Sequence, residues 1–106
     1  MKRTDLRMLW LVERIAQSPH GFAIAWDEEL VDEFIKEFPE AAKSTRRYLI
    51  GSDSCQMLNR AAQRAKGEGF LIAGHIGTDD ARSFNQRTWA RTWSITPAGK
   101  DFAAPI

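Results

Sequence analysis

The chain has 106 residues, of which 43% are hydrophobic and 27% charged, and its formal net charge is +1. These values predict one globular domain, residues 1–106, and exclude a disordered chain or one stapled by internal disulfides, because Cys55 is the single cysteine. No apolar run approaches the roughly 18 to 20 residues of a membrane span, so we expect a cytoplasmic protein with no membrane partner. One Cys and two His residues lack the paired spacing of a structural zinc site, and neither a metal nor a cofactor is expected.

The charge is distributed unevenly along the chain. Residues 1–40 carry a net charge of minus four, and residues 41–106 carry plus five. Residues 43–66 alone hold six basic residues against one acidic residue, Asp53. A concentrated basic segment in a nearly neutral protein indicates a local function.

The pattern of residues 6–17 predicts a helix that ends before Pro19. Its apolar stripe at helical spacing consists of Met8, Leu11, Val12 and Ile15. Three further apolar residues lie partly off this stripe: Leu6, Leu9 and Trp10. Two interpretations follow, a central helix packed on two sides or the interface of a homodimer.

Alternation of Phe22, Ile24 and Trp26 with alanines favours a short strand, although a run this short is also compatible with the start of a helix. Asp27 is the predicted N-cap of the next helix, which Pro39 ends. The expected buried stripe of this helix contains Leu30, Val31, Phe34, Ile35 and Phe38.

The polar face of that helix carries Asp32, Glu33 and Glu37. Because these carboxylates would repel phosphate, we expect this face to point away from any nucleic acid. Its alternative role is a docking surface for a partner, while solvated charge is the commoner case.

Residues 41–50 predict another short helix, which Gly51 interrupts. Ser52 or Asp53 then offers an N-cap for a helix over residues 54–66, and Gly67 suits the left-handed C′ position after it. The expected inner face of this helix is Leu58, Ala61, Ala62 and Ala65. The expected outer face is Gln56, Asn59, Arg60, Gln63 and Arg64, whose amide and guanidinium groups are of the kind that reads base edges.

Two strands are predicted over residues 70–76 and 89–95, the second from the alternation of Trp89, Arg91, Trp93 and Ile95. Together they predict a hairpin whose connection, residues 77–87, is too long for a tight turn. Thr96 and Pro97 begin a last turn or short helix that runs through Phe102.

This order of elements, mainly α with a small antiparallel hairpin (α+β), is that of a winged helix-turn-helix domain. Residues 55–72 resemble the recognition helix and first wing strand of bacterial MarR-like and PadR-like regulators. Trp93-Ser-Ile-Thr-Pro-Ala-Gly resembles the aromatic-x-Leu-Thr-Pro-x-Gly sequence that closes the wing in those groups. The resemblance implies a DNA-binding fold. The extra helix over residues 41–50 departs from the pattern, and neither a long dimerisation helix after Phe102 nor a small-molecule pocket is apparent.

We therefore predict sequence-specific binding of double-stranded DNA by a small transcriptional regulator or repressor. The helix over residues 54–66 reads bases through the outer face given above, and the loop over residues 77–87 is the wing. The predicted contacts to the DNA backbone are Lys43, Arg46, Arg47 and Lys66, with Arg82 and Arg87 in the wing. A homodimer is expected, with Leu6, Leu9 and Trp10 as its interface.

Three alternatives stay open at this point. The basic helix face is merely solvated, or the domain is a winged-helix module that binds protein, with the acidic residues 1–40 as its partner surface. The third is a DNA-binding component of replication, partition or recombination machinery. Catalysis is not expected: Cys55 has no family spacing to His20 or His75, and adjacent Asp79 and Asp80 are typical of a turn.

Overall fold

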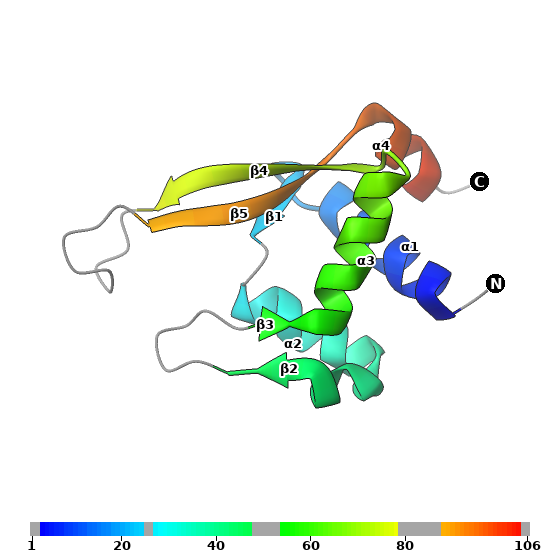
Figure 1. Cartoon of the computed structure of the whole chain (residues 1–106). Helices are drawn as coiled ribbons and strands as arrows, with labels where there is room; N and C mark the ends of the chain where they lie inside the picture. The colour runs from blue at the N-terminus through cyan, green and yellow to red at the C-terminus, as the bar shows by residue number, and fades with distance from the viewer. Residues whose placement is uncertain (1–2, 25–26, 48–53, 79–87, 105–106) are drawn as a thin grey trace.

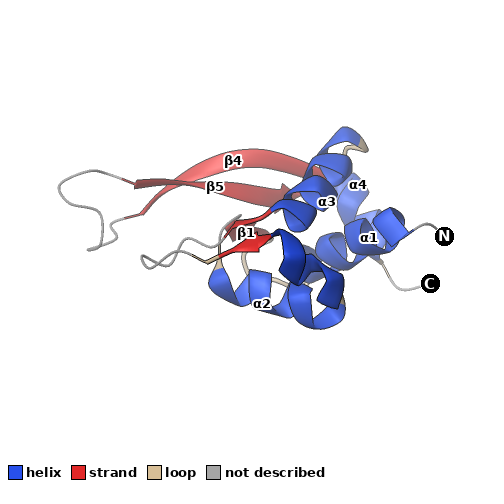
Figure 2. Ribbon diagram, turned by 60° about the horizontal axis from the view of Figure 1, so that its bottom comes forward, coloured by secondary structure: helices blue, strands red, loops and turns tan. Residues whose placement is uncertain are grey.

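The computed structural model describes residues 3–24, 27–47, 54–78 and 88–104, and these form a mostly helical α+β fold with a small antiparallel sheet (Figure 1). In chain order the elements are α1 (Arg3–Ala16), β1 (Phe22–Ile24), α2 (Glu28–Glu37), the 3-10 helix η1 (Pro39–Ser44), β2 (Thr45–Arg46), β3 (Ser54–Cys55), α3 (Gln56–Gly67), β4 (Leu71–Thr78), β5 (Thr88–Ile95) and α4 (Pro97–Ala103). The hairpin β4–β5 extends beyond the helices (Figure 2). Among the described helices, none combines the length and apolarity needed to cross a membrane.

Helix α1 is the centre of the fold and contacts α3, α4, β1 and β5. The four residues of its predicted stripe are all buried. Trp10, off that stripe, packs edge-on against Phe34 and Phe38 near the second helix, with ring centroids 5.4 and 6.3 Å away. Packing within one chain thus accounts for Trp10, whereas Leu9 is partly buried and Leu6 remains 44% exposed, and the homodimer stays a prediction.

Helix α2 begins as predicted, because the carboxylate of Asp27 accepts a hydrogen bond from the amide of Glu29 at 3.1 Å. Leu30, Val31 and Phe34 are buried, and the other two residues of the predicted stripe are partly buried against the core. The strand before this helix is confirmed as β1, while Trp26 lies outside the described residues.

The predicted helix over residues 41–50 is wrong in its described part, residues 41–47, and residues 48–50 lie outside the description. The chain instead forms η1 and then the strand β2, which pairs antiparallel with β3 through Thr45 opposite Cys55. The side chains of Ser44 and Thr45 both donate to the carbonyl of Ala41, at 3.1 and 2.8 Å. Such local hydroxyl–backbone bonds compete with continuation of a helix, and the pairing with β3 gives Thr45 and Arg46 strand partners instead.

Helix α3 differs from its predicted bounds at both ends. Its N-cap is the buried Cys55 rather than Ser52 or Asp53, which lie outside the described residues, and its last residue is Gly67. The left-handed turn comes two residues later, at Gly69, with φ +80°. There the amide of Phe70 donates to the carbonyl of Ala65 at 2.9 Å, the hydrogen bond of a Schellman motif.

The sheet has the strand order β1–β5–β4, so the first strand joins the predicted hairpin, with Ala23 and Ala73 on either side of Trp93. Strand β4 continues to Thr78, two residues into the predicted loop, and residues 79–87 lie outside the description.

The predicted final helix is confirmed as α4, and its first turn explains the Thr-Pro-Ala-Gly sequence. The hydroxyl of Thr96 accepts from the amide of Gly99 at 2.9 Å and donates to the carbonyl of Gly69 at 2.6 Å. A Cβ at Gly99 would lie 2.2 Å from the carbonyl oxygen of Phe70, so glycine permits the close approach of α4 to the turn after α3.

Candidate nucleic-acid interface

Helix α3 presents two chemically different faces. The four residues of its predicted inner face, Leu58, Ala61, Ala62 and Ala65, are buried, as expected. Because three of them are alanines, α1 can pack closely behind the helix, and in Figure 1 α3 lies in front of α1. Packing against α1 therefore fixes the position of the opposite, polar face of α3.

The five predicted base-reading residues do not occupy equivalent positions. Gln56, Arg60 and Gln63 are exposed and recur at the i, i+4, i+7 spacing of one helical stripe, which we call the outer stripe. Asn59 is half-buried on one flank of this stripe, and Arg64 lies on the other flank. Three of the five side chains thus form the most prominent line along α3.

Two of the predicted cationic contacts are held by carboxylates. Arg64 forms an ion pair with Asp5 of α1, and Arg47 forms one with Asp32 of α2. These pairs join residues that are 59 and 15 positions apart in the sequence. Arg60 makes no ion pair within the described part of the chain.

Arg64 was predicted to read a base and Arg47 to contact the backbone, and the remaining predicted backbone contacts lie on several elements. Lys43 on η1, Arg46 on β2 and Lys66 near the end of α3 are all exposed. Arg82 and Arg87 lie outside the described residues, so the wing contacts stay a prediction.

A cavity of about 290 Å³ lies where α1 packs against α3, and no pattern in the sequence predicts it. Its lining consists of Arg7, Met57, Arg60, Ala61 and Arg64. The Arg7 guanidinium donates to Glu40 at 3.0 Å, and the Arg7 side chain is only 14% exposed. Its buried Nε has no hydrogen-bond partner among the described residues. We call this hollow the α1–α3 cavity.

Arg91 is a further exposed cation, and it is not among the predicted site residues. It is exposed on β5, opposite His75 and two positions from Trp93, so it shares the sheet face that packs on the helices. The strand pattern itself could have identified this residue. A charged side chain at Arg91, on the same side of the strand as the buried Trp93, indicates that this part of β5 lies beyond the core.

The described residues contain no group of three or more His, Cys, Asp or Glu side chains arranged to hold a metal ion. Cys55 is buried, with its Sγ 3.9 Å from both the Ser44 hydroxyl and the Ala41 carbonyl oxygen. It therefore packs as a small core residue.

No family of known proteins, no curated protein and no solved structure matches this chain.

Proposed function

We propose that the chain binds double-stranded DNA as a small transcriptional regulator, with α3 as the helix that enters the major groove. The observation that carries this proposal is the outer stripe, three exposed side chains on a helix that contains no acidic residue. Arginine fits O6 and N7 of guanine, and glutamine fits N6 and N7 of adenine. At 1.5 Å per residue the stripe is about 10 Å long, or about three base-pair steps.

The arrangement of elements supports a winged helix within this proposal. A helical core is followed by α3 and then by the long hairpin β4–β5, with β1 on the edge of the same sheet. This order resembles the MarR-like and PadR-like winged domains, with η1 and the β2–β3 pair inserted before α3. The hairpin is then the wing, and Arg91 joins Arg82 and Arg87 as a candidate backbone contact.

The distribution of charged side chains supports one DNA-facing side, because exposed cations lie on η1, β2 and α3, and the acidic residues gather on α2. The cations Lys43 on η1, Arg46 on β2 and Lys66 on α3 are exposed, and each phosphate they meet adds about 0.9 to the slope of log affinity against log salt. The acidic residues of α2 then face away from the duplex, apart from Asp32, which holds Arg47.

The decisive experiment is fluorescence anisotropy with a labelled random-sequence duplex at low and at moderate salt. We expect binding at low salt that weakens steeply as salt rises. Absence of binding at low salt would reject the proposal. Selection of bound sites from a random library then reports the operator, and a palindromic site indicates a twofold homodimer.

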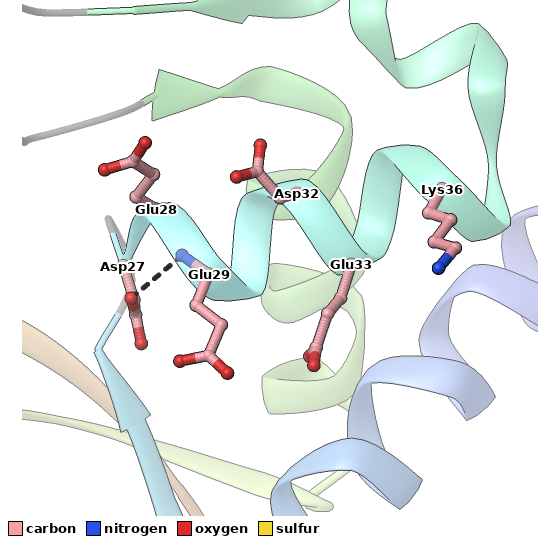
Figure 3. Close-up of a pocket in the computed structure, with 6 residues that line it drawn as sticks. All are labelled: Asp27, Glu28, Glu29, Asp32, Glu33 and Lys36. Carbon is pink, nitrogen blue, oxygen red and sulfur yellow. Dashed lines mark hydrogen bonds between the residues drawn. The ribbon is translucent and has the colours of Figure 1, made fainter.

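One observation favours a second candidate function, a protein-binding module. A hollow of about 460 Å³ along α2 is lined by Asp27, Glu28, Glu29, Asp32, Glu33 and Lys36 (Figure 3). Glu28 and Asp32 point to one side of the helix, and Glu29 and Glu33 point to the other. Glu33 and Asp32 already pair with Arg14 and Arg47, so Glu28 and Glu29 are the carboxylates that would attract a basic segment of another protein. Salt-dependent binding of such a protein without any binding of duplex would favour the second candidate.

A further inference from the structure

Three arginines from two helices line the α1–α3 cavity beside the outer stripe. We infer that this cavity seats a phosphate group of the DNA backbone, and that Asp5 occupies Arg64 until the phosphate displaces it. The inference rests on the proposed function and deepens it. It also assigns Arg64 to the backbone rather than to a base.

The residues that line the cavity are of the kinds that bind an oxyanion. Arg60 and Arg64 approach from α3 and Arg7 from α1, while Met57 and Ala61 provide apolar lining. Guanidinium groups bind phosphate oxygens through paired, charge-assisted hydrogen bonds, and apolar lining reduces competition from water.

The charges around the cavity leave room for one more anion. Three arginines line it, and the carboxylates that pair with them are Glu40 on Arg7 and Asp5 on Arg64. Within the described residues, Arg60 has no such pair, and the buried Nε of Arg7 has no acceptor. The lining therefore carries one uncompensated positive charge, which favours an anion in the cavity.

The Asp5–Arg64 pair is the exchangeable part of the site. The Arg64 side chain is 44% exposed and that of Asp5 27%, whereas Arg7 is buried behind them. A partly exposed ion pair is worth only about 0.2 to 1 kcal/mol, so a DNA phosphate can replace the Asp5 carboxylate at small cost. Asp5 therefore lowers the affinity for every DNA sequence by the same factor.

The test compares three variants on one random duplex and on one selected site. Asp5→Asn should raise affinity for both duplexes by about two- to fivefold, the factor that corresponds to an exposed pair. Arg64→Ala should weaken both equally and reduce the salt slope by about 0.9. Asp101→Asn, the same change at an exposed position of α4, is the matched control for net charge. An Asp5→Asn affinity equal to that of Asp101→Asn would overturn the inference.

A titration with inorganic phosphate, followed by the amide resonances of Met57 and Ala61, separates this inference from the proposed function. Shifts in the wild type that disappear in Arg64→Ala support the cavity as a phosphate site, and competition between phosphate and duplex identifies the DNA backbone as the source. If no variant binds duplex, the proposed function fails, and shifts with phosphate alone then support a site for a free phosphate ester. No shift in the wild type would overturn the site itself.

Discussion

The hydroxyl of Ser44 accepts a hydrogen bond from the amide of Met57 at 3.3 Å, and so caps α3 from 13 positions upstream. The same hydroxyl donates to the carbonyl of Ala41 at 3.1 Å, which fixes its orientation. The N-cap residue Cys55 makes no side-chain capping bond. The last residue of η1 thus holds the first turn of the proposed recognition helix in place.

Ser44→Ala should lower the free energy of unfolding by about 1 kcal/mol, the usual cost of losing a cap. The physical reason is that the first amides of α3 lose an acceptor in a half-buried place. Urea unfolding followed by circular dichroism measures this change. Lys43→Ala, one residue earlier and exposed, is the control, and an equal loss in both variants would show that the hydroxyl contributes nothing.

Two glycines should respond oppositely to alanine. At Gly99 a Cβ would lie 2.2 Å from a backbone oxygen, so Gly99→Ala should destabilise the fold by about 1 to 3 kcal/mol through overpacking. At Gly67, the last residue of α3, no atom lies within 4 Å of the added Cβ, and Gly67→Ala should stabilise by up to about 1 kcal/mol. Thermal unfolding of both variants checks the pair. A stable Gly99→Ala protein would contradict the close approach of α4 to Phe70.

The exposed arginine of the outer stripe should control sequence preference. Arg60→Ala should reduce discrimination between a selected site and its single-base variants by about 1 to 3 kcal/mol at one base pair, since a bidentate contact to guanine is lost. Lys100→Ala removes one positive charge from an exposed position of α4 and is the control. Competition anisotropy with a set of substituted sites measures the change. Uniform weakening across all sites would assign Arg60 to the backbone instead.

The spacing of apolar residues was sufficient to predict those helices and strands whose secondary structure is set by their own sequence. The stripes of α1, α2 and α3 and the alternation of β5 predicted helices and strands that the structure contains. The failure over residues 41–47 concerns contacts that helical periodicity does not report. The hydroxyls of Ser44 and Thr45 bond the carbonyl of Ala41, and Thr45 pairs with Cys55 on another strand.

The candidate site shows the same division. Its outer stripe follows from helical spacing, so the sequence was enough to identify Gln56, Arg60 and Gln63. The pairing of Arg64 with Asp5 and the approach of Arg7 depend on how α1 crosses α3, and tertiary packing alone decides this. Residue type alone therefore grouped Arg64 with the base-reading residues, although its ion pair with Asp5 distinguishes it from them.

The two kinds of apolar residue on α1 allow the predicted homodimer to be tested separately from the core. Leu6 is 44% exposed, whereas Trp10 packs on Phe34 and Phe38 within the same chain. Leu6→Glu should therefore dissociate a dimer that uses this face while it leaves monomer stability within about 0.5 kcal/mol, as is usual for a surface change. Trp10→Ala should instead cost about 3 kcal/mol by leaving a cavity beside α2.

Sedimentation velocity over a range of concentrations, with urea unfolding of the same samples, measures both effects. A wild-type protein that stays monomeric at all concentrations contradicts the homodimer. A Leu6→Glu protein that remains dimeric places the interface elsewhere, because a carboxylate buried there without a partner would oppose association. If Trp10→Ala dissociates the dimer without loss of stability, the ring contacts with Phe34 and Phe38 are not what holds α1 against α2.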